Sequence, residues 1–206
     1  MKTLLKNLPM HIGISLLALS FVSCATSHKP IQPISIPYLS SDKEGNVLLE
    51  YKYDVLEKKY GKKADKKDIQ VIAIKITNNG DRDLVFGKDL ILTYSNGKEV
   101  IMMPQSEMYK SLKQQPAWYL SYLLLTPMNL YITTNTSSSV IPVGLVVGPS
   151  ISLGNIVVAA NGNKKFKTEL DKYNLMGVLI RPGEQHHGII GLQSPNFETL
   201  EIKIVD

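Results

Sequence analysis

The residues able to do chemistry in this 206-residue sequence are few and scattered. His186 and His187 are adjacent, and neighbouring side chains of a strand point to opposite faces, so the pair is not expected to share a metal ion. The serines at 137–139 have no histidine or carboxylate near them in sequence. Gly144 and Gly148 have glycine spacing but lack the Lys-Ser/Thr of a phosphate-binding loop. The pattern predicts no catalytic residues, no metal site and no diffusible cofactor, and therefore a protein that is not an enzyme.

The single cysteine, Cys24, follows a segment with the layout of a secretory signal. Lys2 and Lys6 make a positive start, residues 12–22 form an apolar run too short to span a membrane, and Ser23 precedes the cysteine. A lone cysteine in an exported protein cannot form an internal disulfide, so its position requires another explanation. We predict a signal peptide over residues 1–23.

The four residues Phe21-Val22-Ser23-Cys24 resemble the lipobox of bacterial lipoprotein signals, with Phe21 where leucine is usual. The resemblance covers only the first two dozen residues. It implies diacylglycerol on the Cys24 sulfur, cleavage before Cys24 and acylation of the new amino group. Ala25 behind the cysteine resembles the pattern of lipoproteins sent to the outer membrane, facing the periplasm. The alternative is ordinary secretion with cleavage after Ala25.

A proline-rich segment follows the cysteine. Pro30, Pro33 and Pro37 each fix their own φ and favour extended geometry in the residue before, so residues 24–44 are predicted to form a semi-rigid tether. The alternative is a first edge strand, because Ile34, Ile36 and Tyr38 alternate with polar or small residues.

Short strands with turns between them fill most of residues 45–206. Apolar residues alternate or cluster over these predicted strands: 47–55, 69–77, 84–86, 90–94, 100–103, 178–181, 185–193 and 200–204. Asn96-Gly97 predicts a type I′ hairpin turn, and the lysine-rich residues 57–68 predict a loop. The fold class expected is mainly β, an antiparallel β-sandwich with a loose resemblance to immunoglobulin-like modules of bacterial envelope proteins. That resemblance implies no activity.

One stretch interrupts the strand series. Residues 114–163, here called the charge-free stretch, contain no Asp, Glu, Lys, Arg or His. Two apolar runs, 117–134 and 140–160, are joined by an uncharged turn at 135–139. They predict an α-helical hairpin inserted at about 105–176, with helices over 117–133 and 142–175, the second broken or bent near Pro149.

Small residues recur four apart in the second run. Gly144, Gly148 and Ser152 form one such row, and Gly154 lies four residues after Ser150. Small side chains at this spacing allow two helices to approach closely in lipid. We therefore predict that the row packs against the first helix.

Aromatic and basic residues border the charge-free stretch. Trp118, Tyr119 and Tyr122 lie near its start, and Lys164 and Lys165 follow its end. Aromatic rings and lysines favour the interface between hydrocarbon and water, so these five are candidate membrane-interface residues. The surroundings stay open at this point between packing on the protein's own sandwich or on a second copy, shallow membrane insertion and full spanning.

The net charge of +5 is mild and its basic residues are scattered, so a nucleic-acid partner is not expected. The expected partners are the membrane, through acyl chains on Cys24 and the hairpin, and a protein partner or a second copy. We expect a lipid-anchored envelope protein, facing the periplasm from the outer membrane, that acts as a structural or interaction module. The alternative is a carrier or sensor that uses the hairpin to cover an apolar ligand or lipid.

Overall fold

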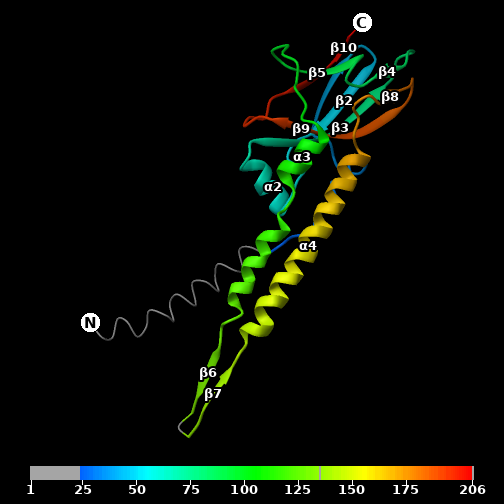
Figure 1. Cartoon of the computed structure of the whole chain (residues 1–206). Coiled ribbons are helices and arrows are strands. Elements are labelled where there is room, and N and C mark those ends of the chain that lie inside the picture. Colours follow the sequence, from blue (N-terminus) through cyan, green and yellow to red (C-terminus); the bar gives the residue numbers. More distant parts are fainter. Residues whose placement is uncertain (1–23, 135, 206) are drawn as a thin grey trace. The chain divides into compact units, whose positions relative to one another are not determined.

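The computed structural model describes residues 24–134 and 136–205, which fall into two compact units. The apolar unit comprises the residues up to Ser27 together with Gln115–Ala160. The sheet unit comprises His28–Gln114 and Asn161–Asp206. Helix α4, Gly144–Lys172, contains the boundary between the two units (Figure 1). The predicted signal peptide, residues 1–23, lies outside the described residues.

The sheet unit is built on an antiparallel four-stranded sheet with the order β1-β2-β3-β9, of which Figure 1 labels β2, β3 and β9. Its strands are β1 (Ser40–Glu44), β2 (Val47–Lys52), β3 (Ile69–Asn78) and β9 (Gln185–Gln193). Every residue of β3 except Lys75 is buried, which fits the near-continuous apolar run IQVIAIKI. A strand buried on both faces needs a packing layer on each side.

Paired short strands supply the layer on one face. β5 (Leu90–Tyr94) pairs with β10 (Leu200–Ile204), and β4 (Leu84–Val85) pairs with β8 (Leu179–Ile180). Ile72, Ile74 and Ile76 of β3 share one core with Leu92 and Ile202 of these pairs. Antiparallel strands therefore lie close to seven of the eight predicted ranges. The predicted strand 100–103 is wrong, because only an isolated bridge from Met102 to Leu192 forms there. The immunoglobulin-like arrangement is not confirmed.

Helices supply the layer on the other face. Val71 and Ala73 of β3 share a second core with α2 (Lys58–Asp65), α3 (Gln105–Leu112) and the end of α4. Helices and strands contribute comparable shares of the described residues, so the fold is mixed rather than mainly β. The lysine-rich residues predicted as a loop form α2, because Tyr60 and Ala64, four residues apart, are both buried on its inner side.

The segment predicted as a tether belongs partly to the sheet unit. His28 and Ile31 are 4% and 5% exposed, and Glu169 accepts hydrogen bonds from the backbone N–H of Ile31 and of Gln32. The first strand begins only at Ser40. Prolines restrict the backbone angles of a segment, but they do not determine whether the segment packs against the rest of the protein. Here the contacts of His28 and Ile31 pack it against the sheet unit.

The Asn96-Gly97 turn exists, but it is not type I′. Gly97 has φ +78°, whereas Asn96 does not have positive φ. The Gly97 N–H donates to the Tyr94 carbonyl at 2.8 Å, and the Tyr94 N–H donates to the Lys98 carbonyl at 2.8 Å. Those bonds close a three-residue loop with a left-handed glycine, a common alternative to the two-residue turn.

The apolar unit departs most from prediction, because it is not an α-helical hairpin. The first apolar run forms a 3₁₀-helix, η1 (Pro116–Leu125), and then strand β6 (Leu130–Thr133), which pairs with β7 (Ser138–Ile141). Pro127 follows η1, and β-branched and aromatic residues occupy β6, so helix gives way to strand. The second run forms α4, which continues through Pro149 without the predicted break.

Candidate functional site

The apolar unit exposes many large apolar side chains. Trp118, Leu124 and Val146 are 76%, 79% and 69% exposed. The other exposed large apolar residues of this unit are Leu120, Leu123, Met128, Leu130, Tyr131, Ile132, Val140, Ile141, Leu145, Val147, Leu153, Val157 and Val158. Soluble monomers rarely expose apolar surface on this scale, and surfaces of this kind are typical of membrane or protein contact sites.

Within the apolar unit, the buried residues of α4 are those with small side chains. The buried residues of α4 in this unit are Gly144, Gly148, Ser152 and Ala159, whereas its valines and leucines are exposed or half-exposed. In water the reverse arrangement is expected, with the large aliphatic residues inside. Helices in lipid associate through small residues and leave large aliphatic side chains on the outside.

The backbone of η1 explains why two of these small residues are glycines. A Cβ on Gly144 would lie 2.2 Å from the Leu125 carbonyl oxygen, and one on Gly148 would lie 3.1 Å from the Tyr122 carbonyl oxygen. The predicted row Gly144, Gly148 and Ser152 therefore includes two positions where α4 approaches η1 closely. Gly154 has no atom within 4 Å of its Cβ position and makes no such contact.

The predicted interface aromatics separate into two groups. Trp118 is exposed, but Tyr119 and Tyr122 are buried, with their rings stacked 6.3 Å apart at 4°. A 3₁₀-helix has three residues per turn, so Tyr119, Tyr122 and Leu125 lie on one side of η1 and share a core with Ala159. The spacing of three between these residues was the signal in the sequence for this buried side, and the α-helical prediction did not use it.

Helix α4 is long and apolar enough to cross a membrane, judged by length and composition alone. It contains 29 residues, and its most apolar window has a mean hydropathy of 1.4. Only 22% of that window is buried, unlike the core helix of a soluble protein. It is the one helix among the described residues with these properties.

A cavity of about 500 Å³ lies within the apolar unit. Its wall is almost wholly apolar and includes Cys24, which is exposed. The backbone N–H of Ala25 donates to Asn155 Oδ1 at 2.5 Å, and Asn155 Nδ2 donates to the Ile151 carbonyl at 2.8 Å. The predicted lipidation residue is thus held beside α4 at the edge of an apolar space.

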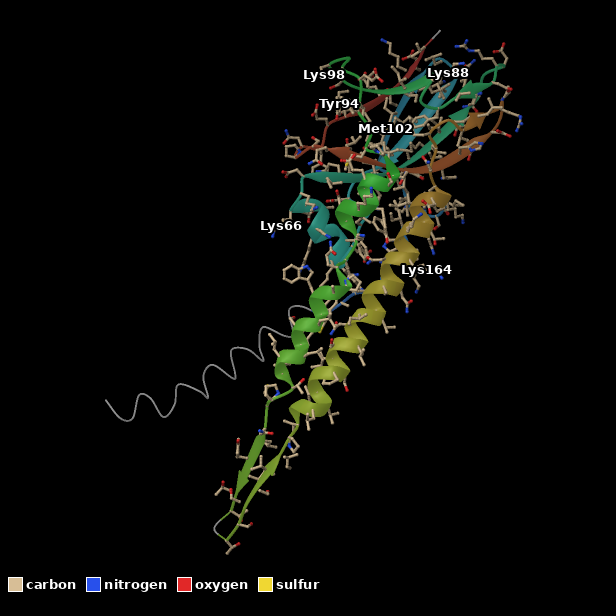
Figure 2. All side chains as sticks on the ribbon, viewed as in Figure 1. Lys66, Lys88, Tyr94, Lys98, Met102 and Lys164 are labelled. Carbon is tan, nitrogen blue, oxygen red and sulfur yellow. The ribbon has the colours of Figure 1, made fainter. Side chains whose placement is uncertain are left out.

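A basic cleft of about 670 Å³ lies in the sheet unit, along the last turns of α4. Lys164, Lys165 and Lys172 contribute to its wall, and Lys164 projects from α4 in Figure 2. Glu169 lies in the same wall but faces His28, with 2.5 Å between Glu169 Oε2 and His28 Nε2. The cleft therefore presents three ammonium groups while its carboxylate is paired.

The pKa of Glu169 is lowered by these contacts. Burial by itself would raise the pKa, but hydrogen bonds from the His28 side chain and from the backbone N–H of Gln32 and Ile31 outweigh it. The carboxylate is consequently ionised at neutral pH and ties the segment after Cys24 to α4 within the sheet unit.

The sequence analysis did not identify a role for Asn163, the last residue of the charge-free stretch. Asn163 Oδ1 accepts hydrogen bonds from the Gln114 N–H at 2.8 Å and from the Tyr60 hydroxyl at 3.0 Å, and its Nδ2 donates to the Gln114 carbonyl at 2.8 Å. The side chain replaces backbone pairing at the point where the chain leaves α3. A polar residue that ends a long apolar run was the only signal in the sequence.

The side chains of the two adjacent histidines contact different partners. His187 Nδ1 is 3.2 Å from the Tyr38 hydroxyl, whereas His186 Nε2 is 3.3 Å from Glu184. Burial, and then the charge of Lys75, lower the pKa of His187. Across residues 24–134 and 136–205, no group of three or more His, Cys, Asp or Glu side chains is placed to hold a metal ion.

No family model, curated protein or solved structure matches the chain.

Proposed function

We propose that the protein is a lipid-anchored component of the bacterial cell envelope, facing the periplasm, whose apolar unit inserts into a bilayer. The carrying observation is the reversed burial in α4, where glycine, serine and alanine are inside and the large aliphatic residues are outside. The sheet unit then serves as the interaction module. For that module we propose an immunoglobulin-like sandwich as the finer fold, because its short paired strands share a core with the four-stranded sheet.

The anchor is a diacylglyceryl group on Cys24. In this modification an S–C thioether bond to a glycerol carbon replaces the Cys24 S–H bond. The bond between that carbon and the phosphate oxygen of a donor glycerophospholipid breaks, and the headgroup phosphate leaves with the electron pair and takes up the thiol proton. A lipid on an exposed sulfur, together with an apolar protein surface, supplies the two signals that stable membrane anchoring requires.

The absence of charged side chains from the first part of α4 favours its insertion into lipid over its packing against a protein surface in water. The 17 residues of α4 that belong to the apolar unit, Gly144 to Ala160, carry no ionisable side chain, and at 1.5 Å per residue they measure about 25 Å. Strands β6 and β7 set a limit on depth. Open strand edges are not tolerated in hydrocarbon, so this hairpin lies in the headgroup region, in water or against a partner.

The anchor is tested in cells supplied with labelled palmitate. Wild-type protein should carry the label and fractionate with the outer membrane, whereas Cys24→Ser should lose the label and accumulate as the uncleaved precursor. Normal processing of Cys24→Ser, with its full membrane association retained, would contradict the lipid anchor.

Insertion is tested separately with a chain that begins at Ala25 and so has no acyl group. This chain should float with liposomes, and Val146→Glu should weaken its binding about tenfold or more, because a charge in hydrocarbon costs about 2.5–3.5 kcal/mol. Ile101→Glu is the matched control, since Ile101 is 87% exposed but belongs to the sheet unit. Equal effects of the two substitutions would remove insertion from the proposal.

A second candidate function is the carriage of a separate apolar ligand, which the cavity of about 500 Å³ favours. Cavities of roughly this size hold small molecules in other proteins. The purified Cys24→Ser protein would then yield a stoichiometric, non-covalently bound lipid on organic extraction. An extract without such a lipid excludes the carrier function.

A further inference from the structure

We infer that the cavity in the apolar unit holds one acyl chain of the lipid on Cys24. The inference rests on the proposed lipid anchor and goes beyond it. A lipoprotein anchor is expected to place all its chains in the bilayer, whereas here one chain is sheltered by the protein that carries it.

The wall of the cavity matches a hydrocarbon chain and little else. Leu125, Met128, Val147, Ile151 and Val158 line it, and it contains no charged side chain. A ligand with a phosphate or carboxylate would find no ammonium or guanidinium group there to pair with. A methylene chain needs no hydrogen-bond partner, so an apolar wall is sufficient for it.

Gly154 leaves room at this wall. Nothing lies within 4 Å of a Cβ built on Gly154, and Gly154 lines the cavity. The open space therefore adjoins α4 itself. A Cβ at Gly154 would meet no other atom, so this position of the cavity wall is suited to a filling substitution.

The attachment point lies at the same wall. Cys24 lines the cavity, and the adjoining Ala25 N–H is held by Asn155 Oδ1. Asn155 is itself oriented by its hydrogen bond to the Ile151 carbonyl, one turn earlier in α4. A chain linked to the Cys24 sulfur thus begins at the cavity and needs no movement of the backbone to enter it.

The cavity volume of about 500 Å³ lies within the range of roughly 300–1,000 Å³ that small-molecule sites occupy. The anchor carries two or more acyl chains, and this space suits one elongated chain. The remaining chains would then supply the attachment to the bilayer.

The experiment uses cells fed a palmitate analogue that carries a photoactivatable diazirine near the end of its chain. The full-length protein is processed in the cells, its membranes are irradiated, and cross-linked peptides are identified by mass spectrometry. We expect intramolecular cross-links from the Cys24 lipid to Val147, Ile151 or Val158. Cross-links to phospholipid alone would overturn the inference while leaving the anchor in place.

Two variants make the result specific. Gly154→Leu fills the cavity and should reduce the intramolecular cross-links several-fold while the label on Cys24 stays at the wild-type level. Val157→Leu, at an exposed position of α4 outside the cavity wall, should change neither. Equal cross-linking in Gly154→Leu and wild type would overturn the inference. Absence of the label from wild-type protein would overturn the lipid anchor itself, so the two failures are distinguishable.

Discussion

The two parts of α4 bury opposite kinds of residue. In the apolar unit, Gly144 and Gly148 are buried while Val146 and Leu153 are 69% and 62% exposed. In the sheet unit, Phe166 and Leu170 are buried with lysines and acidic residues around them. One helix therefore follows the rule of a water-soluble protein at its end and the rule of a lipid-facing helix at its start.

This contrast shows which property selects the buried face. Charged residues restrict Lys164–Lys172 to one orientation, because only the face of Phe166 and Leu170 can enter a core. The residues before Asn161 are apolar on nearly every side, so hydrophobicity does not distinguish their faces. There the closest approach of backbones decides, and the glycines determine where that approach occurs.

The largest contrast is expected between truncations in the two parts of α4. Phe166→Ala should destabilise the sheet unit by about 3–5 kcal/mol, because Phe166 is fully buried against the rings of His28 and Tyr60. Leu153→Ala should change the free energy of unfolding by less than about 0.5 kcal/mol and weaken liposome binding instead. Urea denaturation and flotation measure the two effects. Similar destabilisation by both substitutions would break the comparison.

The next effect concerns the close approach of α4 and η1. Gly148→Leu should destabilise the apolar unit by about 1–3 kcal/mol, since the added side chain meets the η1 backbone. Gly154→Ala has open space and should be neutral or stabilise by up to about 1 kcal/mol through helix propensity. Hydrogen exchange of the amides in 144–160 reports both changes. Unaltered protection in Gly148→Leu would show that small size is not the requirement.

A smaller effect is expected at the basic cleft. Lys164→Gln and Lys165→Gln should each weaken binding to vesicles of anionic phospholipid by about 1 kcal/mol, and added salt should remove the difference. Lys98→Gln is the control, because Lys98 is exposed beside the turn that follows β5 (Figure 2). Loss of binding that persists in neutral vesicles would contradict an electrostatic role.

The smallest effect is a change in pH dependence at Glu169. The folded-state pKa lies below the ordinary value of 4.5, so the pairing stabilises the fold above that value and is lost as the pH falls through the lowered pKa. Glu169→Gln should therefore reduce stability at neutral pH and flatten the acid limb of the stability curve. Thermal melts between neutral and acid pH test this, and an unchanged acid limb would contradict the pairing.

Local patterns predicted the strands of the sheet unit well. β2 and β10 alternate with the period of two that a half-buried strand requires, and β3 is a near-continuous apolar run, so these strands are recognisable without their neighbours. β1 was not predicted, because Ser40–Glu44 is polar. It is stabilised by partners far along the chain, including Asp42 and Glu44 accepting hydrogen bonds from the backbone of β10.

The sequence alone determined the extent of the charge-free stretch, the position of Cys24 and the row of small residues, because these are facts of composition and spacing. Tertiary structure decided that the first run is a 3₁₀-helix and a strand, that Tyr119 and Tyr122 are buried, and that Cys24 lines a cavity. Apolar residues of mixed propensity allow helix and strand at similar local free energy. The choice between them therefore depends on which backbones can pack against one another, and that is settled only when segments distant in sequence meet.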